Sequence, residues 1–140
     1  MQRVTGASVE VGGEIVSSIE VGIVVLLGFC TGDTILKASR LHQRLLTWRV
    51  FKDEGGKMNL SIRDVGGSLL VIPQFTVYGD FSGRRPHFLN AMPPNEASHL
   101  FEGVISDWAS HGVPLKTGIF GADMAVSIHN HGPVTWCWDE

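Results

Sequence analysis

A buried strand is predicted at residues 69–72, where four apolar, β-favouring residues follow one another. Pro73 removes a backbone N–H directly after them, so regular sheet pairing is expected to stop where the strand reaches Gln74. Alternation along an extended chain places the Gln74 and Thr76 side chains on one face and Phe75 on the other. A rigid strand that ends this way commonly delivers polar groups to a site. This stretch alone favours the alternative, an edge strand whose Gln74 and Thr76 side chains face water.

Glycine is frequent in this chain, at 17 of 140 residues against an average of roughly 7%. Frequent glycine predicts many tight turns, and short strands joined by such turns indicate a β-rich fold. With 44% hydrophobic and 18% charged residues, the composition argues against disorder. The length is sufficient for a substantial core, and one domain over residues 1–140 is expected.

The remaining patterns predict two helices set among short strands. A helix capped by Asp33 is expected to run to about Trp48, because apolar residues recur there every three or four positions. A second helix is expected from Pro94 to about Ser110, ended by Gly112. Strands are predicted at residues 7–11, 14–19, 23–29, 50–51, 69–72, 113–116, 124–130 and 134–138. Because residues 23–29 are apolar on both faces, they are expected at the centre of the sheet. This order of elements predicts an α+β domain with an antiparallel or mixed sheet.

Several classes of protein are disfavoured by the sequence. The first residues lack the apolar core of a signal peptide, and no apolar run approaches the ~20 residues of a membrane span, so a cytoplasmic protein without a membrane partner is expected. Cys30 and Cys137 are isolated, which favours buried thiols over a disulfide framework or a zinc site. The net charge of −3 does not by itself indicate nucleic-acid binding. Phosphate-loop, GxGxxG, GxSxG, HExxH and paired CxxC motifs do not occur, which disfavours a standard nucleotide-binding protein or serine hydrolase.

Three further features allow both a chemical and a purely structural interpretation. His129 and His131 could share one strand face as metal ligands, but no third ligand follows at a fixed spacing, so a solvated strand end is favoured and no metal is expected. Gly132-Pro133 between two predicted strands indicates a turn, with a trans peptide bond as the default. Arg84 and Arg85 suit phosphate, although such a pair alone more often forms a solvated surface.

Candidates for direct chemistry are few. Thr76 is the only hydroxyl of the central stretch that could act as a nucleophile, and no base lies near it in the sequence, so it is expected to be a poor one. Glu96, Glu102 and Asp107 are expected on the polar face of the second helix, where they interact with solvent rather than perform acid–base catalysis.

Taken together, two motifs and their flanking residues resemble the D-aminoacyl-tRNA deacylase family nearly from end to end. The family is marked by a Ser-Gln-x-Thr and an Asn-x-Gly-Pro-x-Thr motif, which correspond to residues 73–76 and 130–135. Further matching stretches are residues 2–5, 7–9, 25–28, 51–60, 64–67, 83–86 and 117–124. On these residues the chain is identified as a member of that family.

The resemblance implies two main helices on a mixed sheet, barrel-like at the interface of a homodimer whose active site lies between the subunits. It implies hydrolysis of the ester that joins a D-amino acid, or glycine mischarged on tRNA(Ala), to the terminal adenosine of tRNA. Neither a cofactor nor DNA is implied. Gly132-Pro133, with a cis peptide bond, is implied to enter the partner's pocket as a chiral filter. Its carbonyls would hold the substrate amino group and leave no room for an L side chain. Arg3 is implied to steady this filter, whose motif also contains Asn130 and Thr135.

The resemblance assigns the rest of the pocket as well. The backbone N–H groups of Gln74, Phe75 and Thr76 are implied to form a floor that meets the ester or its developing oxyanion. The implied walls around the adenosine and the aminoacyl group are Phe120, Gly121, Ala122 and Met124. For the nucleophile the family offers two possibilities, Thr76 itself or a water activated by the 2′-hydroxyl of the tRNA, and the lack of a base near Thr76 favours the second. Arg84 and Arg85 become candidates for tRNA contact.

One departure from the family pattern bears on specificity. Pro73 stands where the family usually has serine, so a hydroxyl and one backbone donor are absent from the floor. A related animal deacylase with relaxed chiral discrimination also has proline there, but its second motif differs from residues 130–135, so D-specificity is retained as the expectation. The alternatives are a deacylase that accepts some L-aminoacyl-tRNA, a catalytically inactive tRNA-binding homologue, and a hydrolase of small D-amino esters.

Overall fold

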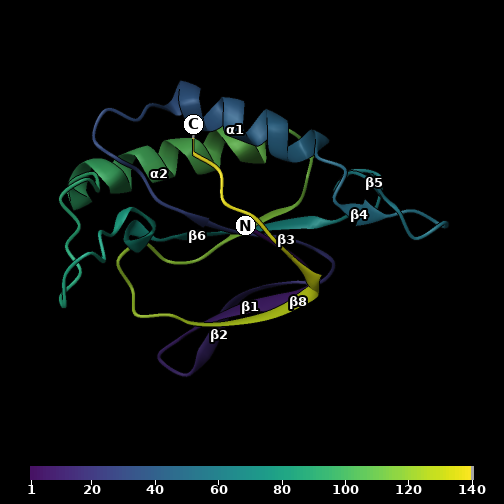
Figure 1. Ribbon diagram of the computed structural model, residues 1–140, viewed down its shortest axis with the longest axis horizontal. Helices are drawn as coiled ribbons and strands as arrows, with labels where there is room; N and C mark the ends of the chain where they lie inside the picture. Colours follow the sequence, from purple (N-terminus) through teal and green to yellow (C-terminus); the bar gives the residue numbers. More distant parts are fainter. Residues whose placement is uncertain (140) are drawn as a thin grey trace.

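The computed structural model describes residues 1–139 as a curled sheet with two helices packed side by side on one face (Figure 1). The elements in chain order are β1 (Gln2–Val11), β2 (Glu14–Ile19), β3 (Gly22–Leu27), α1 (Ile35–Thr47), β4 (Phe51–Lys52), β5 (Met58–Leu60), β6 (Ser68–Pro73), the 3₁₀ helix η1 (Phe75–Tyr78), α2 (Pro94–Ala109), β7 (Leu115–Thr117) and β8 (Ala125–Thr135).

Strand β1 connects most of the sheet, because it pairs antiparallel with β2, β3 and β8. The strand order is β2-β1-β3-β6-β7, and the β3–β6 and β6–β7 pairs are parallel. The Ser17 hydroxyl on β2 donates to the Thr117 carbonyl on β7 at 2.8 Å, so the two ends of this order meet. The sheet is therefore a nearly closed barrel of mixed direction, which confirms the predicted α+β class.

The core has two parts, one on each face of the central strands. Ile23, Val25 and Val71 face the helices, whereas Val24 and Leu70 face the inside of the curled sheet. All five side chains are completely buried. This alternation explains why the sequence is apolar on both faces at β3, whose predicted central position is confirmed. Full burial of each such side chain stabilises the fold by about 1.5–3 kcal/mol.

Helix α1 begins one residue later than predicted. Its N-cap is Thr34, whose hydroxyl accepts a hydrogen bond from the Lys37 N–H at 3.4 Å, so the prediction of Asp33 as the cap was wrong. The Asp33 carboxylate instead accepts from the Cys30 N–H at 2.8 Å and forms an ion pair with Lys37 at 3.1 Å. Asp33 thereby closes the turn before the helix rather than the helix itself.

Helix α2 confirms its predicted bounds and corrects one of its side chains. It begins at Pro94, a residue suited to the first turn, and ends at Ala109. Asp107 was expected to face only solvent, but it is half-buried and accepts a hydrogen bond from the Ser39 hydroxyl of α1 at 2.7 Å. This bond joins the two helices.

A buried histidine lies between the same two helices. His42 of α1 is fully buried and stacks on Trp108 of α2, with ring centroids 4.6 Å apart. The His111 ring meets it edge-on at 5.1 Å. Neither nitrogen of His42 has a hydrogen-bond partner among residues 1–139. Burial, with a smaller contribution from His111, lowers the pKa of His42 to about 4.

Two parts of the chain differ from the predicted strands. The residues after Pro73 form η1 instead of continuing as a strand, so the predicted alternation of Gln74, Phe75 and Thr76 was wrong. The two predicted C-terminal strands form one strand, β8, which contains Gly132-Pro133, so this dipeptide is not a turn between strands. The register between β1 and β8 shifts twice near this dipeptide, which lets the strand continue past it. No helix within residues 1–139 is long and apolar enough to span a bilayer.

Candidate active site

The end of β6 delivers the predicted floor residues to the surface. Gln74 follows the strand and is the N-cap of η1. Its N–H donates to the Leu27 carbonyl of β3 at 2.7 Å, so the prediction that this N–H meets a substrate oxygen was wrong. The N–H groups of Phe75 and Thr76 have no hydrogen-bond partner among residues 1–139. Two of the three predicted backbone donors are therefore available to a ligand.

A glycine lets η1 lie directly on the neighbouring strand. A Cβ atom at Gly28 would lie 2.3 Å from the Val77 methyl Cγ2 and 2.6 Å from the Gln74 carbonyl oxygen. Both distances are far shorter than a van der Waals contact, so a side chain here would force the floor outward. Gly28 thus fixes the position of the floor relative to β3.

A cavity of about 380 Å³ opens beside this floor. Gln74 and Phe75 line it on one side, and Phe120 and Gly121 line it on another. The remainder of its lining is mostly apolar and comes from Pro73, from Leu27, Gly28 and Phe29 after β3, and from residues of the loop before α2 and of α2 itself. Three other predicted site residues, Thr76 of the floor and Ala122 and Met124 of the walls, are not among the residues that line it. The cavity could enclose a group the size of an amino acid, with the Phe75 N–H at its floor and apolar walls.

The loop between η1 and α2 contributes to the same cavity. Phe88 lines it and packs edge-on against Phe75, with ring centroids 4.8 Å apart. Asp80 and His87 pair across the base of this loop through two backbone hydrogen bonds, and their side chains approach to 3.3 Å. Arg84 and Arg85 lie between them and are both exposed. The two arginines are near the cavity in the chain but outside its lining.

The second predicted group of residues lies on β1 and β8. Arg3 is only 2% exposed, and its Nε and Nη2 donate to the His131 carbonyl at 3.0 and 2.9 Å. Its Nη1 donates to the Val50 carbonyl at 2.5 Å. A Cβ atom at Gly132 would lie 2.7 Å from Nη2 of Arg3, so only glycine lets this backbone rest on the guanidinium. The peptide bond between Gly132 and Pro133 is cis.

This segment of β8 projects outward although its anchor is buried. Gly132 and Pro133 are both exposed, and so are Asn130 and Thr135. The Asn130 amide donates to the Thr135 hydroxyl at 2.9 Å, which links the two ends of the segment. None of these four residues lines the 380 Å³ cavity. One chain therefore places the floor and the Gly132–Pro133 segment in separate regions.

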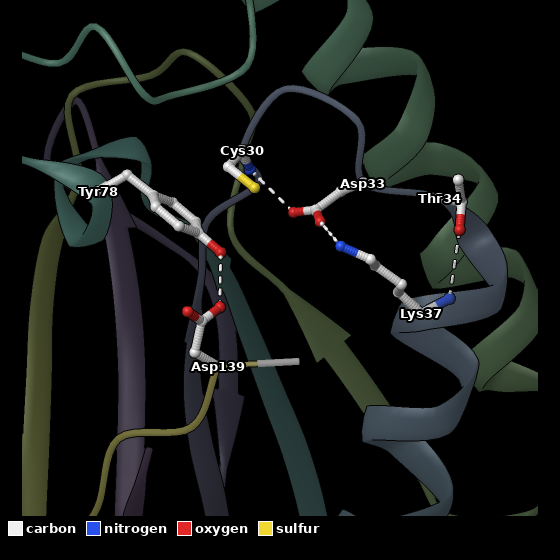
Figure 2. A network of polar contacts seen from close by, with 6 residues as sticks. All are labelled: Cys30, Asp33, Thr34, Lys37, Tyr78 and Asp139. Carbon is white, nitrogen blue, oxygen red and sulfur yellow. Dashed lines mark hydrogen bonds and ion pairs between the residues drawn. The ribbon is translucent and has the colours of Figure 1, made fainter.

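A second groove, of about 660 Å³, is lined in part by residues 25–29, at the end of β3 and just after it. Thr135 and the C-terminal residues 136–139 form one wall of it. Figure 2 shows polar contacts there: the Tyr78 hydroxyl donates to Asp139 at 3.2 Å, and the Asp33 carboxylate accepts from the Cys30 N–H and from the Lys37 ammonium. Burial raises the pKa of the Tyr78 hydroxyl and, with help from Asp33, that of the Cys30 thiol, so both groups stay protonated at neutral pH.

Sequence reasoning missed this second groove. The spacing of Asp33 and Lys37 by four residues was a usable signal for their ion pair. No signal pointed to the contact between Tyr78 and Asp139, which are 61 residues apart. His129 and His131, the considered metal ligands, are both exposed, and no group of three potential ligands converges within residues 1–139.

Comparison with known proteins gives consistent results. The family model described as D-Tyr-tRNA(Tyr) deacylase matches residues 1–139. A relative named D-aminoacyl-tRNA deacylase from Pelobacter propionicus is 50% identical over 97% of this chain and 94% of its own length. One with the same name from Bacillus licheniformis is 49% identical over 99% of this chain and 95% of its own length.

Two solved structures share the fold. The one described as c-Myc DNA Unwinding Element Binding Protein has a TM-score of 0.88 and 40% sequence identity, and the match covers 95% of this chain and 91% of that one. The other, described as a structural analysis of a probable eukaryotic D-amino acid tRNA deacylase, has a TM-score of 0.74 at 16% identity, and the match covers 94% and 92%. At that identity the second match supports the fold alone.

Proposed function

This chain belongs to the D-Tyr-tRNA(Tyr) deacylase family, and on that premise we propose that it removes D-amino acids from tRNA. It is a hydrolase of carboxylic esters, and its products are the free D-amino acid and tRNA. The observation that carries this function is the identity of about half of all residues, over nearly the full chain, to proteins named for the activity. The cavity beside Gln74 and Phe75 supports it, because those residues belong to the motif by which the sequence resembles the family.

The active site is formed by two copies of the chain. In one copy the Gly132–Pro133 segment does not line the cavity, although the family resemblance requires the two to act together. The segment is exposed and anchored by the buried Arg3, as expected of a part that enters another subunit. Three apolar side chains of η1 and the loop after it, Phe75, Val77 and Phe81, are 52–66% exposed, and a second copy would cover them.

Chirality is judged by the backbone of the partner subunit. The Gly132 and Pro133 carbonyls would accept hydrogen bonds from the substrate ammonium group and so fix the α-carbon. With that carbon fixed, an L side chain points into the backbone and is rejected, whereas a D side chain points into the cavity. Glycine has no side chain to reject, so glycyl-tRNA mischarged on tRNA(Ala) is also a substrate.

Hydrolysis proceeds by attack of water on the ester carbonyl. The Phe75 and Thr76 N–H groups, which have no partner within residues 1–139, would stabilise the oxyanion that develops. The absence of a hydrogen bond from the Thr76 hydroxyl to a base among those residues supports a nucleophile other than Thr76. The 2′-hydroxyl of the terminal adenosine supplies the activation instead, since it is adjacent to the ester.

Parallel deacylation of D-tyrosyl-, L-tyrosyl- and glycyl-tRNA, at protein concentrations far below the substrate, tests this function. Multiple turnovers with the D and glycyl substrates and none with the L substrate are expected. Turnover of the L substrate at a comparable rate would instead indicate relaxed chiral discrimination. Pro73, which stands where the family usually has serine, would be the candidate cause. Tight tRNA binding without turnover would indicate an inactive homologue, and cleavage of free D-amino esters alone would indicate a small-molecule hydrolase.

A further inference from the structure

We propose that Arg49, Lys52, Lys57 and Arg63 form a cationic surface that binds the phosphate backbone of the tRNA whose 3′ end is being deacylated. This inference rests on the proposed function, and it adds a docking site for the body of the tRNA. The surface lies on the β4–β5 hairpin and the chain on either side of it.

The charges of the chain are strongly segregated around this hairpin. Residues 40–63 contain six of the 11 Lys and Arg residues and only two of the 14 Asp and Glu residues, a net charge of +4. All other residues together contain five Lys and Arg against 12 Asp and Glu, a net charge of −7. The overall charge of −3 therefore conceals a local positive region on an otherwise acidic protein, which is the pattern expected of a nucleic-acid contact.

The four cations are exposed and their charges are not neutralised. None of them forms an ion pair with a carboxylate of residues 1–139. Arg49 donates to the Asn59 side chain and Arg63 donates to the His111 carbonyl, both at 3.2 Å. These neutral acceptors orient the guanidinium groups and leave their charge available to phosphate.

Two of the three acidic residues closest in the chain accept hydrogen bonds from the backbone, whereas Glu54 in the hairpin turn is exposed and offsets part of the positive charge. Asp53 in the hairpin turn accepts a hydrogen bond from the Lys57 N–H at 2.9 Å and so shapes the turn. Asp64 accepts from the Ser61 N–H and hydroxyl, both at 2.7 Å. The Ser61 hydrogen bonds lower the pKa of the Asp64 carboxyl, and Arg49 adds to this effect, so Arg49 lies near the turn that contains Arg63.

Two contacts connect the cationic surface to the Gly132–Pro133 segment. Val50, between Arg49 and the hairpin, accepts a hydrogen bond from the same Arg3 guanidinium that holds His131. Trp48 packs edge-on against Trp136, just beyond β8, at 5.6 Å. In Figure 1 the β4–β5 hairpin extends outward on the side of the body where β8 ends.

This placement defines which subunit holds the tRNA. In the proposed dimer, the Gly132–Pro133 segment of one subunit enters the cavity of its partner. The tRNA end bound in that cavity then leads past the hairpin of the subunit that supplied the segment. One subunit would therefore judge the amino acid and grip the tRNA, while the other supplies the floor.

The experiment compares Lys52→Gln/Lys57→Gln with the charge-preserving Lys52→Arg/Lys57→Arg, on two substrates and over 50–300 mM salt. The substrates are D-tyrosyl-tRNA and 3′-O-D-tyrosyl-adenosine, which has no tRNA body. The Gln variant is expected to raise KM for the tRNA about 5- to 10-fold at low salt with kcat unchanged. The salt slope of log kcat/KM should fall by about 0.7–0.9 for each phosphate that is no longer neutralised. The Arg variant should behave as the wild type, and the short substrate should respond to neither change.

Unchanged KM and salt slope in the Gln variant would overturn the proposal, and so would an equal loss on the short substrate, since that would indicate damage to the active site. Binding of deacylated tRNA, followed by fluorescence anisotropy with duplex DNA as competitor, is the second measurement. Equal competition by DNA at the same phosphate concentration would indicate a surface that binds any polyanion, and would overturn the proposal of a tRNA site. If the wild type hydrolyses neither substrate, the proposed function fails, and the anisotropy still tests the surface by itself.

Discussion

The floor at Gln74–Thr76 and the Gly132–Pro133 segment are the two halves of the proposed site, and they are constructed in opposite ways. The floor borders a concave, mostly apolar cavity and offers backbone donors. The segment is exposed, offers backbone acceptors, and is held from behind by one buried cation, Arg3. A cavity alone accepts either enantiomer that fits, and a projecting backbone alone binds nothing tightly. Discrimination therefore requires both halves at once, and in the proposed dimer each subunit supplies one half to its partner's site.

The strongest test of this comparison is to break one half in each of two subunits. Gly28→Ala should displace the floor, because the new methyl group would meet Gln74 and Val77, and Gly132→Val should displace the segment from Arg3. Each variant alone is expected to lose nearly all deacylation. After the two are unfolded and refolded together, half of the dimers should be mixed and each should contain one intact site, so about a quarter of wild-type activity should return. A site within one chain would give no recovery. Gly55→Ala, where a Cβ has room, is the matched control.

The second test concerns the floor alone. A substrate that ends in 2′-deoxyadenosine should be hydrolysed about 10²- to 10³-fold more slowly, because it lacks the group proposed to activate the water. Thr76→Ala should retain activity within about 10-fold, since it keeps the backbone N–H. Single-turnover deacylation measures both. A folded Thr76→Ala variant without activity would restore threonine as the nucleophile.

The third test concerns the segment alone. Arg3→Ala removes three donors and leaves the His131 and Val50 carbonyls unpaired, so the free energy of unfolding should fall by about 3 kcal/mol. The ratio of D to L deacylation should fall with it, because the carbonyls of the segment are no longer fixed. Arg3→Lys should recover part of the stability but little of this ratio, since one ammonium cannot span both carbonyls. Urea unfolding and paired rate measurements check both effects, and a D/L ratio unchanged in Arg3→Ala would contradict the positioning role.

Sequence patterns identified the rigid parts of this protein and missed its irregular ones. The apolar runs at β3 and β6 and the periodicity of both helices depend on burial, which leaves a direct mark on residue type. Asp33 and Thr34 are adjacent and both favour the N-cap position, so the sequence alone could not decide which of them caps α1. Pro73 predicted where β6 ends, but neither the 3₁₀ helix that follows nor the continuation of β8 through Gly132 left a local pattern in the sequence.

The same distinction holds for the site. Motif resemblance named the residues of both halves, but it assigned all three floor N–H groups to the substrate. The Gln74 N–H is in fact used by the Leu27 carbonyl, a contact between residues 47 positions apart that depends on the parallel pairing of β3 and β6. The position of a donor could be predicted, whereas its availability could not.

The fourth test concerns the stability of the whole fold, through the His42 side chain buried between α1 and α2. The pKa of His42 is about 4 in the folded state and about 6.5 in the unfolded chain, so only the unfolded state binds a proton between these values. Stability is therefore intact above pH 6.5 and decreases as the pH falls, by about 2–3 kcal/mol at pH 4. His42→Phe should remove this dependence. Urea unfolding at several pH values measures it, and a pH profile that is the same in both proteins would contradict the assignment.

The smallest effect is expected at Pro73, the one floor residue that departs from the family pattern. Its ring occupies the end of β6 opposite Leu27, so the floor lacks a hydroxyl and a backbone N–H there. Pro73→Ser should raise the D/L deacylation ratio by about 3- to 10-fold, which corresponds to one added hydrogen bond. Pro73→Ala separates the two causes, because it restores the N–H without the hydroxyl. If only Pro73→Ser raises the D/L ratio, the hydroxyl is responsible. If both variants raise the ratio equally, the backbone N–H is responsible. If neither variant changes the ratio, chirality is set by the Gly132–Pro133 segment alone, and the floor contributes only to rate.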